Sequence, residues 1–214
     1  NLLLKDLEPG VRLISGHGSQ GTDGMMQGID GSFDCAILIG YHAMAGTLFG
    51  VMEHTVTGRV HRMWINGMPA GEIALSAGVA GRYGVPIVCV SSDAAGATEA
   101  SGLIPGLSTA VVKTGYGRYQ AECLPLAQTG PMISAAAEKG VKSAKSIKPW
   151  QPDAPCTLRI EFNRSEEADY AARVPGVSRV DAYTLEYMGQ TFEEMHRAAW
   201  SIFPMGSVGY DSND

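Results

Sequence analysis

The sequence predicts an α/β protein: a mostly parallel sheet with helices on both faces, followed by a smaller α+β C-terminal lobe. Two continuous apolar runs, at residues 35–39 and 85–90, end at glycine or serine, which is typical of strands buried on both faces of a parallel sheet. Helix-like segments alternate with these strands. In the second half, residues 156–162 alternate polar and apolar side chains, which indicates a half-exposed strand. We therefore expect an α/β domain at residues 1–106 and a smaller α+β lobe at residues 107–214.

The composition is that of an ordinary globular protein, because hydrophobic residues make up 45% and charged residues 18% of the 214 positions. The net charge of −6 and the lack of a basic run argue against nucleic acid as a partner. No apolar segment reaches the length of a membrane span, so we expect no membrane partner. The four cysteines are far apart and form no CxxC pair, which favours reduced thiols and a cytoplasmic location.

The first elements lead up to the strand at residues 35–41. Pro9 and Gly10 predict a turn, and residues 11–15 predict a short strand. The glycine-rich segment at 16–21 lacks the spacing of a phosphate-binding loop, so we expect a plain surface loop there. One or two helical turns are expected at residues 25–29.

The next segment combines a hairpin with a tightly packed helix. Residues 55–65 alternate enough to form a strand or a hairpin arm, with Asn66 and Gly67 as its turn. The small apolar residues 70–83 predict a helix packed closely on the sheet, and Gly84 ends it.

The rest of the chain continues the same alternation. Asp93 follows the strand at 85–90 and is a good N-cap for a helix at 94–102. Thr191 is placed to cap the last helix. The remaining predicted elements are a strand at 107–113, a helix at 125–139, the strand at 156–162, a helix beginning at Ser165, a bent strand at 178–188 and a helix at 192–203.

Titratable side chains concentrate between residues 35 and 72, where His42, His54 and His61 fall within twenty positions and Glu72 follows. His42 comes just after a buried strand, at the end of the sheet where α/β proteins bind ligands. An imidazole and a carboxylate are usual zinc ligands. The same residues also fit structural roles without a metal. His42 would hydrogen-bond to the loop backbone, and the helix dipole would favour Glu72 at the start of its helix. His54 fits a general base or a surface residue, and we expect a structural role for His61.

Several runs of residues, taken together, resemble the M55 family of metallopeptidases, of the D-aminopeptidase type. The likeness covers nearly the whole chain, and its most specific parts are GYHA around His42 and the GE pair that ends at Glu72. The runs that carry it are residues 13–16, 36–43, 50–54, 64–72, 80–86, 103–106 and 160–162.

The resemblance implies a zinc-dependent aminopeptidase that releases the amino-terminal residue of small peptides, often D-amino-acid peptides, with two zinc ions per active site. It implies that His42 and Glu72 are zinc ligands and that His54 is the catalytic residue. It also implies a ring-like homo-oligomer. Asn66, at a tight turn near this site, is expected either to position substrate or simply to form the turn.

The chain departs from the family pattern in one respect. The family's S-x-D-x-E-G and N-D-S-H runs, which supply the other zinc ligands, do not occur here, and the chain begins at Asn1 without an initiator methionine. Because a two-metal site needs a bridging carboxylate, we expect the absent ligands to come from a preceding or separately cleaved segment. The alternative is a non-catalytic binding or assembly subunit that retains the fold without a complete metal site.

Overall fold

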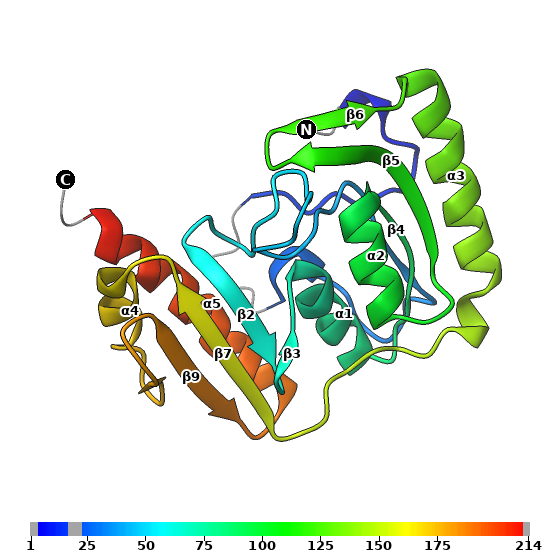
Figure 1. Cartoon of the computed structure of the whole chain (residues 1–214). Helices are drawn as coiled ribbons and strands as arrows, with labels where there is room; N and C mark the ends of the chain where they lie inside the picture. Colours follow the sequence, from blue (N-terminus) through cyan, green and yellow to red (C-terminus); the bar gives the residue numbers. More distant parts are fainter. Residues whose placement is uncertain (1–3, 17–22, 212–214) are drawn as a thin grey trace.

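The computed structural model of the chain describes residues 4–16 and 23–211, which form two sheets and their covering helices (Figure 1). The glycine-rich loop predicted at residues 16–21 lies, beyond Gly16, outside the described residues. No helix among the described residues is long and apolar enough to cross a membrane.

The first sheet has the strand order β1-β4-β5-β6. β1 pairs with β4, and β4 with β5, in parallel, whereas β6 runs antiparallel to β5. β4 is buried at all seven of its residues, as expected for a central parallel strand. The strands of this sheet are β1 (Ala36–Leu38), β4 (Ile87–Asp93), β5 (Ser108–Gly117) and β6 (Gln120–Cys123). Two helices, α2 (Ala94–Leu103) and α3 (Leu126–Lys142), pack against β4 and β5.

The second sheet is antiparallel throughout, with the order β3-β2-β7-β9-β8. Two helices, α4 and α5, pack against β7 and β9. This sheet takes two of its strands from the first half of the chain. The elements are β2 (Val60–Ile65), β3 (Met68–Pro69), β7 (Cys156–Phe162), β8 (Ser178–Arg179), β9 (Thr184–Gly189), α4 (Ser165–Ala171) and α5 (Phe192–Asp211).

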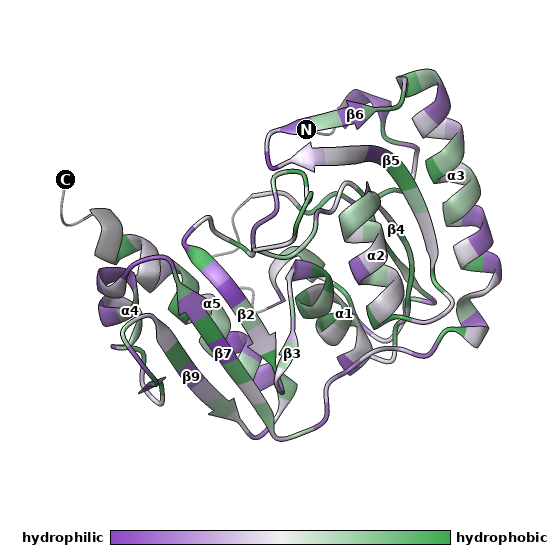
Figure 2. Cartoon of the chain, viewed as in Figure 1, coloured by the Kyte–Doolittle hydropathy of each residue, from purple (hydrophilic) through white to green (hydrophobic). Residues whose placement is uncertain are grey.

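Helix α1 (Glu72–Arg82) joins the two cores, because its first nine residues are all buried. Leu75 packs with the apolar side chains under the second sheet, and Ile73 packs with those under the first. A helix that is apolar all round is expected in such a central place. In contrast, α3 alternates hydrophobic and hydrophilic stretches along its length (Figure 2). The α/β class and the mostly parallel first sheet are therefore confirmed, and the division at residue 106 stays a prediction.

Most local predictions are confirmed. Asp93 caps α2 by accepting a hydrogen bond from the Gly96 N–H, and Gly84 has a φ of 74°. Asn66 and Gly67 form the β2–β3 turn with φ of 50° and 78°. Three short 3-10 helices complete the part of the fold that the structure describes: η1 (Leu4–Asp6), η2 (Gly24–Met26) and η3 (Ala144–Ser146).

Four predictions of local structure are corrected. The strand predicted at residues 11–15 is wrong, because this segment pairs with no described strand. The strand β6 was not predicted, and α5 extends eight residues beyond 203. The bent strand predicted at 178–188 is a hairpin, since the Asp181 carboxylate accepts the N–H groups of Tyr183 and Thr184 and turns the chain.

Candidate metal centre

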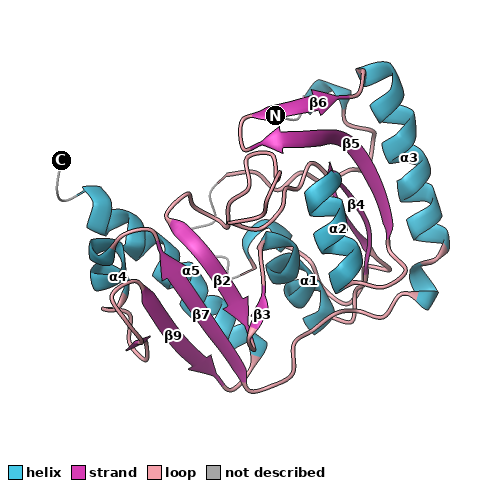
Figure 3. Cartoon of the chain, viewed as in Figure 1, coloured by secondary structure: helices cyan, strands magenta, loops and turns pink. Residues whose placement is uncertain are grey.

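Three predicted site residues, His42, His54 and Glu72, come together at one place. One ligand atom from each lies within 4.8 Å of the others. His42 follows β1, His54 lies in the loop between β1 and β2, and Glu72 is the first residue of α1. The loop that leads into β2 is drawn in pink in Figure 3. Within the described chain this is the one group of three or more such side chains close enough to share a metal ion.

The two imidazole rings present the same nitrogen to the carboxylate. The Nε2 atoms of His42 and His54 lie 3.4 and 3.7 Å from Glu72 Oε1, and the rings stack with centroids 3.9 Å apart. His42 Nδ1 lies 3.1 Å from the carbonyl of Ala43, and His54 Nδ1 lies 2.6 Å from that of Met52. Because a carbonyl only accepts, each Nδ1 donates, and each neutral ring keeps a free Nε2 lone pair.

The electrostatics favour an ionised Glu72 carboxylate beside a basic His42 imidazole. Burial raises the pKa of Glu72, but the hydrogen bonds from the protonated form of His42 and from the Val56 N–H, at 2.7 Å, outweigh it, so this pKa falls below its usual value. Burial lowers the pKa of His42, but the hydrogen bond that its protonated ring donates to Glu72, together with the Ala43 carbonyl and nearby carboxylates, outweighs it and raises this pKa. Two imidazole nitrogens and one carboxylate oxygen are a donor set that fits zinc.

The loop at residues 43–56 is held by side chains that accept its backbone N–H groups. It needs this support, because Phe49, Met52 and Val56 have φ of 60°, 54° and 63°, in the left-handed region that residues other than glycine seldom adopt. The strain is greatest at Val56, whose side chain is β-branched. The anchors are Glu99 for Met44 N, Thr55 for Ala45 N, Glu53 for Gly46 N, Asp93 for Val51 N and Glu72 for Val56 N, at 2.5–3.1 Å. His54 is therefore presented by a loop of fixed conformation.

Sequence reasoning missed three of these anchors, Glu99, Glu53 and Thr55, and it also missed Arg118, which supports Glu53. Arg118, from the β5–β6 turn, donates to the carbonyl and to the carboxylate of Glu53, the residue before His54. Asp93 was predicted only as a helix cap, yet its second oxygen accepts the Val51 N–H. No spacing in the sequence marks the contacts made by Asp93, Glu99 and Arg118, because they join segments 42–65 residues apart.

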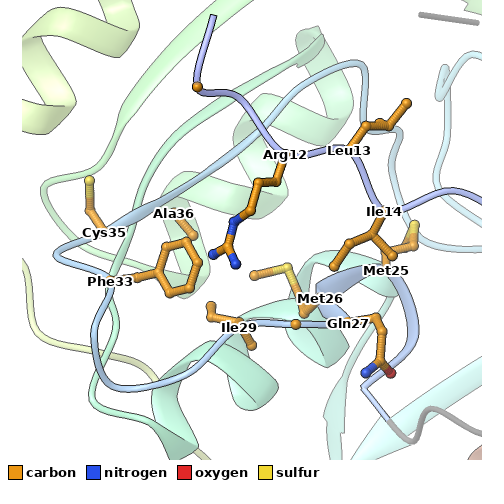
Figure 4. A pocket seen from close by; sticks show the side chains of 12 residues that line it. Arg12, Leu13, Ile14, Met25, Met26, Gln27, Ile29, Phe33, Cys35 and Ala36 are labelled. Carbon is orange, nitrogen blue, oxygen red and sulfur yellow. The ribbon is translucent and has the colours of Figure 1, made fainter. Parts of the chain in front are cut away.

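One cavity borders His54, and a larger one lies at the start of β1. A polar cavity of about 360 Å³ beside His54 is bounded by Glu53, His61, Arg118 and Asn163, among others. A larger, mostly apolar cavity of about 880 Å³ lies along the start of β1 (Figure 4). Its lining residues labelled in the figure are Arg12, Leu13, Ile14, Met25, Met26, Gln27, Ile29, Phe33, Cys35 and Ala36.

Asn66 is not part of the group formed by His42, His54 and Glu72. Its side-chain amide donates to the Asp153 carbonyl at 2.8 Å and accepts the Thr157 N–H at 2.7 Å. Both ends of the amide are thus taken up by main chain, which favours the turn role over the substrate role.

Comparisons with known proteins identify the family of this chain. The sequence profile of the peptidase M55 family, described as D-aminopeptidase, matches residues 1–201. The D-aminopeptidase of Bacillus subtilis (strain 168) is 34% identical over 199 residues, which cover 92% of this chain and 72% of that protein. A solved structure, the Zn-dependent D-aminopeptidase DppA from Bacillus subtilis, a self-compartmentalizing protease, matches with a TM-score of 0.91 and 33% identity over 97% of this chain and 75% of that one. The chain therefore belongs to the peptidase M55, or D-aminopeptidase, family.

Proposed function

We propose that the protein is a zinc-dependent aminopeptidase that hydrolyses the amino-terminal residue of small peptides, including D-amino-acid peptides. The observation that carries this proposal is the convergence of His42, His54 and Glu72 within 4.8 Å of one another. Two relatives support the proposal. A protein that is 34% identical to this chain is named as a D-aminopeptidase, and a matching solved structure is described as Zn-dependent. A non-catalytic binding subunit is not favoured, because such a protein has no need of a converged ligand set.

In this proposal His42 and Glu72 hold zinc, and their surroundings prepare them for it. The Ala43 carbonyl fixes the His42 ring with Nε2 free, and the Val56 N–H orients the Glu72 carboxylate. Bound zinc supplies Lewis acidity, which lowers the pKa of a coordinated water and polarises a scissile carbonyl. A second ion, also proposed, needs a bridging carboxylate beyond the three converging side chains of the described residues.

His54 is proposed to accept and return a proton during hydrolysis. Its Nδ1–H is held by the Met52 carbonyl, so its free Nε2 is the atom that takes the proton. Its side chain is 31% exposed, against 22% for His42, so substrate can reach it more easily. The same Nε2 is also close enough to serve as a third zinc ligand, and the two roles give different results in the experiment below.

The test combines zinc analysis with a peptidase assay on D- and L-alanyl dipeptides. His42→Ala and Glu72→Ala are expected to lose both bound zinc and activity, whereas Glu138→Gln, at an exposed carboxylate on α3, keeps both. His54→Ala is expected to keep zinc and to lose about 10²–10⁴-fold in kcat, the usual contribution of a general base. Loss of zinc in His54→Ala would make His54 a ligand, and unchanged zinc and activity in the first two variants would remove the assignment.

We also propose that the protein works in the cytoplasm as a ring-like homo-oligomer. The support is that the matching structure is described as a self-compartmentalizing protease. Size-exclusion chromatography with light scattering measures the mass directly. A mass of several subunits is expected, and a monomer at micromolar concentration would contradict the proposal.

A further inference from the structure

One peptide group lies between His42 and a carboxylate on α2. The carbonyl of Ala43 accepts the hydrogen bond from His42 Nδ1 at 3.1 Å. The N–H of the same peptide group, on Met44, donates to Glu99 Oε2 at 2.7 Å. Glu99 and His42 are thus connected through a single rigid amide plane, without touching each other directly.

The packing of α2 keeps this connection short. Gly96, one turn before Glu99, lies so close to the loop that a Cβ there would be 3.1 Å from Ala43 N and 2.1 Å from Ser92 Oγ. On the other side, a Cβ on Gly71 would lie 3.0 Å from Glu99 Oε1. Glu99 is therefore enclosed between the segment that carries His42 and the residue that precedes Glu72.

We infer that Glu99 is a positioning residue for the metal centre, which acts through the Ala43–Met44 peptide group. By accepting the Met44 N–H it fixes the plane of that amide, and the amide carbonyl then holds His42 as the Nδ1–H tautomer with Nε2 free. This is the arrangement of a carboxylate that orients a ligand histidine, with a peptide group inserted between them. The inference rests on the proposed metal-binding role of His42.

What Glu99 supplies is a hydrogen-bond acceptor at the right distance. Its Oε2 makes the bond to Met44, while its Oε1 is buried and has no partner among the described residues. Glutamine has the same length and keeps an acceptor oxygen, so Glu99→Gln retains the connection without the charge. Aspartate keeps the charge but is one methylene shorter, so Glu99→Asp breaks the connection. The two variants therefore distinguish the effect of the length of the side chain at position 99 from the effect of its charge.

The experiment is ¹⁵N NMR of the histidine side chains in the metal-free protein, which reports the tautomer of each ring without any need for activity. Wild type and Glu99→Gln are expected to show His42 with a protonated Nδ1 and an unprotonated Nε2. Glu99→Asp and Glu99→Leu are expected to show a mixture with the Nε2–H form. His54, whose Nδ1 is held by Met52, serves as an internal control that keeps its tautomer in all variants.

The zinc affinity of the same variants is a second, independent measurement. Glu99→Asp is expected to weaken zinc binding about 10- to 100-fold, as is usual when the partner of a ligand histidine is lost, and Glu99→Gln by less than about 3-fold. Thr98→Val, whose exposed hydroxyl bonds only within α2, is the matched control and is expected to match wild type. A wild-type tautomer and zinc affinity in Glu99→Asp would overturn the inference. If no variant of the chain binds zinc, the proposed function fails while the tautomer result still stands on its own.

Discussion

Replacing Glu99 with glutamine is expected to make the metal-free protein more stable at alkaline pH. Burial, the largest influence, raises the pKa of Glu99 from 4.5 to about 7, although the Met44 N–H and the charge of His42 lower it. Because the folded-state pKa lies above the unfolded value, the stability that this carboxyl contributes is complete below pH 4.5. It is lost as the pH rises towards 7. Glutamine does not ionise and does not suffer this loss.

The size of the effect follows from the shift. A rise in pKa from 4.5 to about 7 corresponds to about 3 kcal/mol at about 1.4 kcal/mol per unit, which is an upper value. Urea unfolding of both proteins in EDTA, at pH 5 and pH 8, measures the difference in unfolding free energy. The advantage of Glu99→Gln over wild type is expected to grow by about 2–3 kcal/mol between these pH values. An advantage that stays constant, or shrinks with rising pH, would refute the reasoning.

Four further variants test the packing, the loop and the β2–β3 turn. Gly78→Ala on α1 is expected to lower stability by about 1–3 kcal/mol, because its Cβ would lie 2.3 Å from the Phe192 ring. Gly102→Ala, at an exposed position of α2, meets nothing within 4 Å and is expected to add up to about 1 kcal/mol in thermal unfolding. Asp93→Ala removes a helix cap and a loop anchor together, so a loss of about 2–3 kcal/mol in urea unfolding is expected, and a loss under about 0.5 kcal/mol would contradict this view. Asn66→Gly keeps the positive φ but removes two hydrogen bonds, so a lower Tm with unchanged KM is expected, and a raised KM would assign Asn66 to substrate binding.

The parts of the fold that depend on local chemistry could be predicted from the sequence. The apolar run at 85–90, the cap at Asp93 and the glycine stop at Gly84 each act within a few residues, and each is confirmed. The pairing of strands acts over long distances and could not be predicted. Nothing in the pattern of residues 60–65 shows that this strand joins the second sheet beside β7.

The candidate site could likewise be predicted from the sequence only in its local features. His42 could be singled out because it follows a buried strand, and Glu72 because it begins a helix within an apolar segment. Their distance from each other, and the supporting role of Glu99, depend on how α1 and α2 pack on the loop after β1. Glu99 has no sequence signal of its own, since a glutamate inside a helix is usually a solvated side chain.

The central claim is that His42 and Glu72 hold a zinc ion with His54 beside it. The most direct measurement is X-ray diffraction from crystals grown with zinc, recorded above and below the zinc absorption edge. An anomalous peak about 2.0–2.2 Å from His42 Nε2 and a Glu72 carboxylate oxygen is expected, as for zinc sites in general. Zinc peaks found elsewhere, with none between these two residues, would contradict the account.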